Sequence, residues 1–174
     1  MIAVVDYGLG NLASVRNAFR HVGADVIVTA EGDEICHADG IVLPGVGAAS
    51  AGMQRIRDRG LEQVIRQVAR SGTPVLGLCL GMQLLFDRSE EGNTPCLGLI
   101  PGAVRRIEGQ VKVPHIGWNE VVQRDGSPMF QRISGRPYFY FVHSYICVPA
   151  DEQVISGVTE YSGSFCSAVV SKMV

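Results

Sequence analysis

A single cysteine, Cys79, stands at the end of a short apolar run, with Gly77 and Gly81 two positions on either side of it. An apolar stretch, residues 80–86, follows at once. This layout is typical of a nucleophile elbow, in which a strand turns sharply into a helix and projects a nucleophile from the bend. Glycine suits both flanking positions because a side chain there would clash inside the tight turn. The alternative is that Cys79 is a small buried core residue, as most free cysteines are.

A cysteine that attacks a carbonyl carbon needs a reactive thiolate, an oxyanion hole and a general base. A helix that begins behind Cys79 would lower the pKa of the thiol. In an elbow, the backbone N–H of the next residue, Leu80, points at the developing oxyanion. The glycine-containing segment 44–47 is a candidate for a second donor. His115 and His143 are candidate bases, although a histidine among aromatic strand residues is more often structural.

Composition indicates one globular domain and excludes several classes of protein. The chain has 174 residues and a net charge of −2, and its arginines are scattered, which argues against a nucleic-acid binder. Five cysteines form no CxxC pair and the four histidines are dispersed, so we expect no metal site and no cofactor. The absence of a signal peptide and the reduced thiols predict a cytosolic protein. No apolar run approaches the ~18 residues that span a membrane.

The first half of the sequence predicts alternating strands and helices. Its short, continuous apolar strands are typical of a parallel sheet covered by helices on both faces, a three-layer α/β fold. Ligands bind outside the carboxyl ends of such strands, so the loops at 6–11, at 44–47 and at Cys79 are expected on one rim. Gly60 divides the last long helix if it acts as a breaker. We expect strands at 1–5, 24–29, 41–43 and from 74 to the elbow, and helices from 11, over 52–70 and after Cys79.

After residue 88 glycines, prolines and short strands dominate, which predicts additional β-hairpins. No linker or internal repeat marks a second domain, so we expect a single domain over residues 1–174. The expected strands are 103–107, 120–123, 138–142, 153–158 and 164–170.

Five motifs resemble a known family. Gly77-Leu-Cys-Leu-Gly-Met-Gln83 resembles the nucleophile motif of the class I (triad) glutamine amidotransferases. The elbow alone indicates only this class, whereas the five motifs in this order resemble the glutaminase subunits of imidazole glycerol phosphate synthase, of histidine biosynthesis. The other four are Asp6-Tyr-Gly-Leu-Gly-Asn-Leu12, Leu43-Pro-Gly-Val-Gly47, Pro114-His-Ile-Gly-Trp-Asn119 and Tyr140-Phe-Val-His-Ser-Tyr145.

The resemblance implies a reaction and a set of site residues. Cys79 would attack the carboxamide carbon of glutamine, release ammonia and form a γ-glutamyl thioester that water converts to glutamate. Leu80 and Val46 would supply the oxyanion-hole amides, the latter after a backbone rearrangement. The residues implied to hold glutamine are Gly47, Gln83, Ser144 and Tyr145.

The resemblance also implies a partner. Ammonia would pass to a cyclase subunit with a (β/α)8 barrel, which forms a heterodimer with the glutaminase. The residues implied to lie near that interface or the ammonia passage are Asn11, His115, Trp118 and Tyr140; for Trp118, core packing is the alternative. Two other functions stay open: a docking subunit of the cyclase without catalysis, and another cysteine hydrolase on the same fold.

One family motif is missing from the sequence. The family's base and its orienting glutamate come in a His-Pro-Glu motif, which does not occur among these 174 residues. His143 belongs to a different motif, so the resemblance does not assign it the role of base. We therefore expect a glutamine amidotransferase domain that is truncated at its C-terminus, or a natural short variant. We expect little or no glutaminase activity from the chain alone, because loss of a triad member removes most of the rate.

Overall fold

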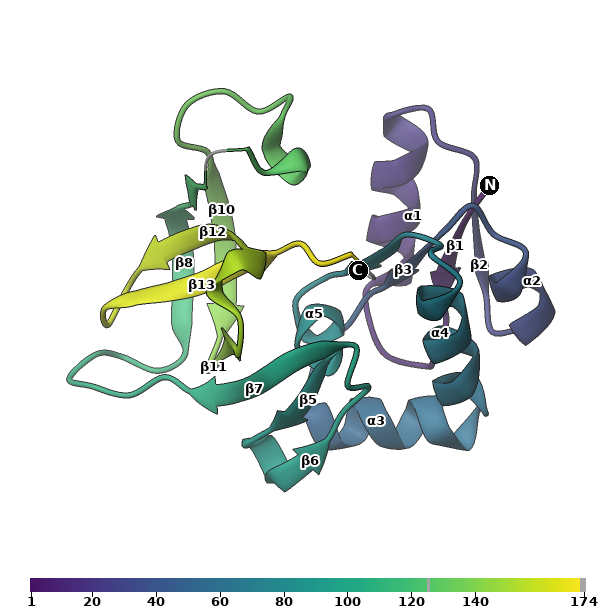
Figure 1. The fold of residues 1–174 in the computed structure, drawn as a ribbon, viewed down its shortest axis with the longest axis horizontal. Coiled ribbons are helices and arrows are strands. Elements are labelled where there is room, and N and C mark those ends of the chain that lie inside the picture. The colour runs from purple at the N-terminus through teal and green to yellow at the C-terminus, as the bar shows by residue number, and fades with distance from the viewer. Residues whose placement is uncertain (125, 173–174) are drawn as a thin grey trace.

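The computed structural model describes residues 1–124 and 126–172, and its N-terminal half contains a parallel four-stranded sheet (Figure 1). The strand order is β2-β1-β3-β4, and every neighbouring pair is parallel. This confirms the parallel sheet predicted from the continuous apolar runs. The strands are β1 (Ile2–Val5), β2 (Val26–Thr29), β3 (Gly40–Leu43) and β4 (Val75–Gly77).

Helices cover both faces of this sheet and make a three-layer α/β fold. Side chains alternate along a strand, so Val4 faces one side of the sheet while Ala3 and Val5 face the other. On the side of Val4 lies α1 (Leu12–His21), which packs Val15 and Phe19 against the sheet. The helices on the other side are α2 (Gly32–Cys36), α3 (Ala49–Asp58), α4 (Leu61–Arg70) and α5 (Leu80–Leu84).

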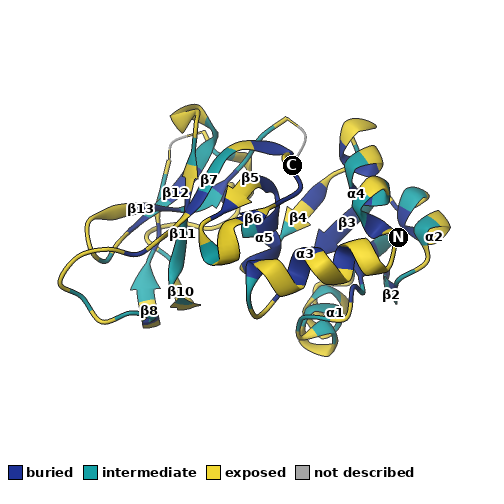
Figure 2. Cartoon of the chain, turned by 90° about the horizontal axis from the view of Figure 1, so that it is seen from below, coloured by how far each residue is buried: buried dark blue, intermediate teal, exposed yellow. Residues whose placement is uncertain are grey.

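Two helix boundaries follow from local chemistry. The side-chain oxygen of Asn11 accepts a hydrogen bond from the Ser14 amide and caps α1. Gly60 has a φ of 69°, a left-handed conformation that glycine adopts without strain, so the expected helix over 52–70 is divided into α3 and α4. The sequence prediction missed α2, because five residues are too few to show a helical period. Figure 2 shows the buried residues gathered where these helices meet the sheet.

The second half of the chain forms a mixed seven-stranded sheet, on the left in Figure 1. The strand order is β6-β5-β7-β11-β13-β12-β9, with β5 parallel to β7 and the other pairs antiparallel. The strands are β5 (Phe86–Ser89), β6 (Thr94–Pro95), β7 (Ile100–Arg106), β9 (Val122–Gln123), β11 (Tyr145–Pro149), β12 (Ile155–Glu160) and β13 (Ser164–Val169).

A separate two-stranded antiparallel ribbon consists of β8 (His115–Glu120) and β10 (Tyr138–His143). We call it the β8–β10 ribbon. After β10 the chain continues through Ser144 directly into β11, so the ribbon is covalently joined to the large sheet.

Several strand predictions in this half were wrong in extent. The strand expected at 120–123 is interrupted at Val121, which is buried and turns the chain from β8 to β9. The strand expected at 153–158 begins with a 3-10 turn over Glu152–Val154. Most of β8 and all of β11 were missed, because the polar and glycine residues of β8 and the proline that ends β11 obscure the strand pattern.

The nucleophile elbow expected from the sequence is present between β4 and α5. Cys79 has φ 54° and ψ −112°, a strained backbone conformation for a residue with a side chain. A Cβ at Gly77 would lie 2.7 Å from the Met82 backbone, and one at Gly81 would overlap the Leu43 carbonyl oxygen. Both glycines are therefore required by steric contact within the turn, as the sequence pattern predicted.

Replacing Gly81 by alanine is expected to destabilise the fold by about 3 kcal/mol, because the new methyl group meets rigid backbone and not a movable side chain. Gly40→Ala is the matched control, since its Cβ would come no closer than 3.6 Å to any atom and should change stability by less than about 1 kcal/mol. Urea unfolding of both variants measures the difference. Equal stabilities would show that the elbow does not need the close approach.

Candidate active site

Three loops meet at the carboxyl ends of β1, β3 and β4, as expected for one rim of a parallel sheet. The hydroxyl of Tyr7, in the first loop, donates a hydrogen bond of 2.5 Å to the carbonyl oxygen of Pro44 in the second. A Cβ at Gly45 would lie 2.8 Å from the Cβ of Leu80 in the elbow. The second loop is therefore held between the first loop and the elbow, where its amides can face a ligand bound at Cys79.

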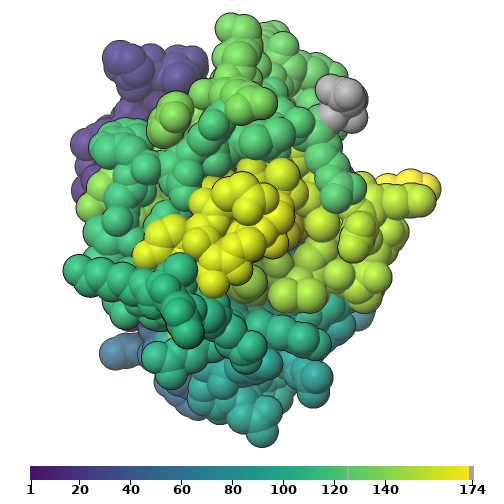
Figure 3. All heavy atoms as spheres, turned by 90° about the vertical axis from the view of Figure 1, so that its left-hand side faces the viewer, coloured from purple at the N-terminus to yellow at the C-terminus, as the bar shows by residue number. Residues whose placement is uncertain are grey.

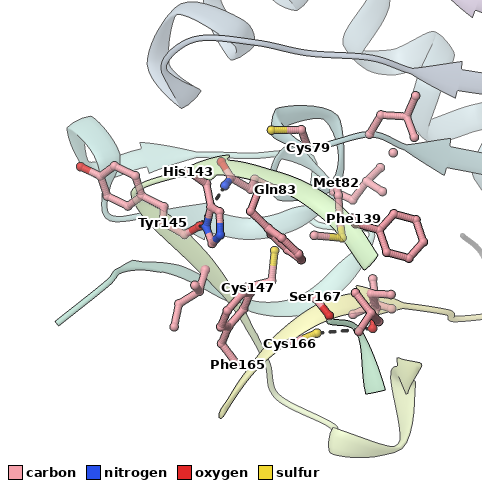
Figure 4. Close-up of a pocket in the computed structure, with 18 of the residues that line it drawn as sticks. Cys79, Met82, Gln83, Phe139, His143, Tyr145, Cys147, Phe165, Cys166 and Ser167 are labelled. Carbon is pink, nitrogen blue, oxygen red and sulfur yellow. Dashed lines mark hydrogen bonds between the residues drawn. The ribbon is translucent and has the colours of Figure 1, made fainter. Parts of the chain in front are cut away.

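A cavity of about 530 Å³ opens beside the elbow. In Figure 4, Cys79 stands on one side of this cavity, and Phe165 and Cys166 stand on the opposite side. Most of its lining is apolar, whereas the polar side chains of Gln83 and His143 lie together on one flank. The cavity can take up a molecule with an apolar stem and a polar head, which fits the general form of small-molecule sites.

Cys79 is exposed as a residue, but the atoms crowded around its thiol keep the thiol protonated. Burial raises the pKa of Cys79, and the hydrogen bond from the Leu80 amide opposes that effect only in part. The amide at the start of α5 does act in the direction that the sequence argument expected, but burial outweighs it and the pKa of the thiol is raised overall. Cys79 needs a group that removes its proton before it can attack a carbonyl carbon.

Neither candidate base offers a free lone pair to the thiol. The Nε2 atom of His143 is 3.0 Å from Nδ1 of His115, and the Nδ1 atom of His143 is 2.9 Å from the Tyr145 carbonyl oxygen. Both nitrogens of His143 are thus engaged with other groups. The role of general base stays unassigned among the described residues, 1–124 and 126–172.

Two of the residues expected to hold a substrate, Gln83 and Tyr145, line the same cavity, and the other two are chain neighbours of lining residues. The Gln83 amide Nε2 donates 3.2 Å to the Tyr145 carbonyl oxygen, and the Gln83 backbone N–H donates 3.1 Å to the Cys79 carbonyl oxygen. Both residues line the cavity, as does Val46. Gly47 follows Val46 on the exposed loop with a φ of 103°, and Ser144 directly precedes Tyr145. The structure thus brings the predicted nucleophile, oxyanion-hole and substrate-binding residues to one region.

The residues expected at a partner interface are divided between two places. Trp118 and Tyr140 are cross-strand neighbours on the β8–β10 ribbon with ring centroids 5.7 Å apart, and they are 71% and 57% exposed. His115 is on the opposite side of the same ribbon and is buried. Asn11 is exposed at the start of α1, on the rim formed by the strand ends.

The inner side of the ribbon is supported by the last hairpin. His115 stacks on Tyr161 at a centroid distance of 3.9 Å. The Tyr161 hydroxyl donates to the Lys112 carbonyl oxygen and the Ser162 hydroxyl to that of Glu108, both at 2.6 Å. Figure 3 shows the hairpin between β12 and β13, in yellow, set among the green residues of the second half. The ribbon therefore rests on a fixed base and presents its other face to solvent.

Sequence reasoning missed two contributors to the site, Tyr7 and Asn119. Tyr7 is fully buried and burial raises its pKa, so it remains a neutral donor to Pro44. Asn119 donates to His115 from within the ribbon. Both residues stood inside motifs that the sequence displayed, but their roles depend on contacts across the fold. Among residues 1–124 and 126–172, no group of three His, Cys, Asp or Glu side chains could hold a metal ion, and no helix is long and apolar enough to cross a membrane.

Comparison with known proteins gives a family and close relatives. The family model described as glutamine amidotransferase class-I matches residues 3–173. The chain is 45% identical over 173 residues to imidazole glycerol phosphate synthase subunit HisH of Dehalococcoides mccartyi (strain CBDB1), which covers 99% of this chain and 84% of the relative. It is 47% identical over 169 residues to the protein of the same name from Moorella thermoacetica, covering 97% of this chain and 80% of the relative.

Solved structures share the fold at low sequence identity. A crystal structure titled glutamine amidotransferase superimposes with a TM-score of 0.71 at 16% identity, covering 94% of this chain and 88% of that chain. A glutamine amidotransferase from Thermotoga maritima gives 0.59 at 16% identity, covering 94% and 74%. These likenesses show the same α/β architecture.

The raised pKa of Cys79 predicts how its alkylation depends on pH. Only the thiolate reacts, so the rate of modification by iodoacetamide should rise about tenfold per pH unit and still be rising at pH 9. Peptide mass mapping of the Cys79 adduct over a pH series measures this. A plateau below pH 8 would contradict the desolvated thiol. Glutathione measured alongside gives the profile of an ordinary thiol.

Proposed function

The chain belongs to the class I glutamine amidotransferase family, and from this membership we propose that it acts as the glutaminase subunit of imidazole glycerol phosphate synthase. It hydrolyses glutamine to glutamate and ammonia, and a cyclase subunit uses the ammonia in histidine biosynthesis. The elbow conformation of Cys79, beside a cavity and the 44–47 loop, is the observation that supports this proposal most strongly. The proposal includes one amidotransferase domain, a cytosolic location and no cofactor.

Cys79 is the proposed nucleophile. After loss of its proton, the sulfur attacks the carboxamide carbon of glutamine and forms a tetrahedral adduct whose oxyanion is stabilised by the amides of Leu80 and Val46. The carbon–nitrogen bond then breaks. The leaving nitrogen takes up the proton that the thiol lost and departs as ammonia. Water hydrolyses the γ-glutamyl thioester to glutamate and restores the thiol. Leu80 suits its part because it directly follows the nucleophile at the start of α5.

Glutamine binding is proposed for Gly47, Gln83, Ser144 and Tyr145. The support is that Gln83 and Tyr145 line the cavity and share a hydrogen bond, while Gly47 and Ser144 are the chain neighbours of the lining residues Val46 and Tyr145. An exposed loop backbone and hydrogen-bonded polar groups together suit a small amino-acid substrate, which needs orientation more than burial.

The proposed partner is a cyclase subunit with a (β/α)8 barrel. The exposed face of the β8–β10 ribbon supports this, since Trp118, Tyr140 and their neighbours Ile116 and Val142 are each more than half exposed. An exposed cluster of this kind is typical of a protein interface. Ammonia would leave the site towards that partner, with Asn11 and His115 near its route.

A docking subunit without catalysis is the second candidate. The observation that favours it is that the ring nitrogens of His115 and His143, the two candidate bases among residues 1–124 and 126–172, are all engaged with groups other than Cys79. The two functions predict different chemistry at the same interface, so one assay separates them.

The assay is ammonia release from glutamine in the presence of the cyclase subunit and its nucleotide ligand. For a glutaminase, release should exceed the uncatalysed background, and Cys79→Ala should reduce it to that background. The absolute rate should be low if no residue replaces the base, since oxyanion stabilisation alone leaves about 10³-fold over water. Equal release from both chains, together with tight cyclase binding, would identify the docking subunit and reject the glutaminase.

The interface proposal predicts that Trp118→Ala weakens cyclase binding by about 2 kcal/mol, or roughly 30-fold in Kd, because a central exposed aromatic anchor is lost. Val22→Ala is the matched control, as Val22 is 76% exposed at the far end of α1. Isothermal titration of the cyclase subunit into each variant gives both constants. Equal losses of affinity in the two variants, or no loss for Trp118→Ala, would show that the ribbon is not part of the interface.

A further inference from the structure

Two histidines on the inner face of the β8–β10 ribbon form a series of hydrogen bonds that the catalytic proposal does not use. Nδ1 of His115 lies 3.0 Å from Nε2 of His143, and Nε2 of His115 lies 3.3 Å from Nδ2 of Asn119. At the other end, Nδ1 of His143 lies 2.9 Å from the Tyr145 carbonyl oxygen. This carbonyl also accepts the Gln83 amide at 3.2 Å. This series of hydrogen bonds therefore runs without interruption from the ribbon to α5, the helix that follows Cys79.

At the Asn119 end of this hydrogen-bond series, the orientation of the side-chain amide is fixed. The Asn119 side-chain oxygen accepts from the Glu120 amide at 2.8 Å, and its Nδ2 donates to the Glu160 carbonyl oxygen at 2.9 Å. These two backbone partners determine which end of the amide is oxygen and which is nitrogen. Nδ2 is thus a donor towards His115, and the His115 Nε2 atom must carry a lone pair.

The second end is fixed in the same way. A carbonyl oxygen can only accept, so Nδ1 of His143 carries its hydrogen and donates to Tyr145. The two nitrogens that face each other then need one hydrogen between them. His115 has no proton on Nε2, so it must carry one on Nδ1, which donates to the bare Nε2 of His143. Only one arrangement satisfies every contact, with both rings neutral and both protonated at Nδ1.

The surroundings support neutral rings. His115 is 3% exposed and lies between Phe141, with centroids 5.0 Å apart, and Tyr161, at 3.9 Å. Burial lowers the pKa of both His115 and His143, which disfavours an added proton. An added proton on Nε2 of His115 would face the N–H donor of Asn119, and one on Nε2 of His143 would face the N–H donor of His115.

We propose that His115 and His143 are positioning residues, locked as neutral Nδ1–H tautomers, that hold the Tyr145 carbonyl and through it the Gln83 side chain. Gln83 is bonded through its backbone N–H to the Cys79 carbonyl oxygen, so the chain ties the β8–β10 ribbon to the nucleophile helix. The ribbon's exposed face and its buried histidine lie on opposite sides of one strand. A displacement of the ribbon by a bound protein is thereby transmitted to the substrate side of the cavity. The meaning of that displacement for catalysis rests on the proposed glutaminase function.

The tautomers are measured directly by ¹⁵N NMR of the ring nitrogens in the full chain labelled at histidine. His115 and His143 should each show a protonated Nδ1 and an unprotonated Nε2. The exposed His21 serves as an internal reference that has no such constraint. A proton on Nε2 of either ring would overturn the proposal. This readout needs neither glutamine turnover nor a partner, so it stays informative if the glutaminase function fails.

The coupling to Gln83 is tested with His115→Phe, which keeps an aromatic ring between Phe141 and Tyr161 but removes the donor to His143. The Gln83 side-chain amide resonances should shift, and modification of Cys79 by a glutamine-like electrophile should slow at least about fivefold. Modification by iodoacetamide should not change, because it does not use the substrate contacts. His21→Phe is the control and should alter neither reading.

A second variant keeps the test valid if His115→Phe does not fold. Asn119→Leu removes the donor at the far end and leaves both imidazoles in the structure. His115 should keep its proton on Nδ1, because the bare Nε2 of His143 still needs a donor, but loss of the Asn119 contact should again shift the Gln83 amide. Unchanged Gln83 resonances in the folded variants would show that the histidines have a purely structural role and would overturn the coupling.

Discussion

The close approach of the elbow backbone to the end of β3 is the constraint on which the site depends. Gly81 lies so near the Leu43 carbonyl that no side chain fits between them, and Gly45 is confined between Tyr7 and Leu80. Three loops from separate strands are thereby brought into contact. The strained Cys79 backbone persists because packing on both sides over-determines it. Rigid placement of a nucleophile next to potential oxyanion donors is what acyl transfer requires.

The same packing has a chemical cost. Burial leaves the Cys79 thiol protonated, since it outweighs the single amide that favours the thiolate. The nearest histidines serve a hydrogen-bonded chain between the ribbon and Gln83, and their lone pairs are occupied. The described part of the chain thus separates two tasks. It holds a nucleophile and the polar groups of the proposed substrate site in place, while activation of the nucleophile depends on a further group.

Local pattern was enough to predict the features that depend on neighbouring residues. Gly77 and Gly81 indicated the elbow, and continuous apolar strands indicated the parallel sheet, because both follow from short-range sterics and burial. The β8 and β11 strands were missed since their partners are distant in sequence. The net pKa of Cys79 was not predictable for a related reason: the helix start is readable from the sequence, but the apolar groups that line the cavity beside the thiol come from segments that are distant in sequence, such as β4, β10 and β13. Likewise, no spacing reveals that His115 faces His143.

The central claim is that Cys79 is a nucleophile directed at glutamine, and its most direct test is protection by that substrate. The full chain is treated with an electrophilic glutamine analogue, with and without glutamine, and each cysteine is followed by peptide mass. The account predicts an adduct confined to Cys79 that forms more slowly as glutamine is added, while asparagine has no effect. Modification of Cys79 no faster than that of the partly exposed Cys36, and indifferent to glutamine, would contradict it.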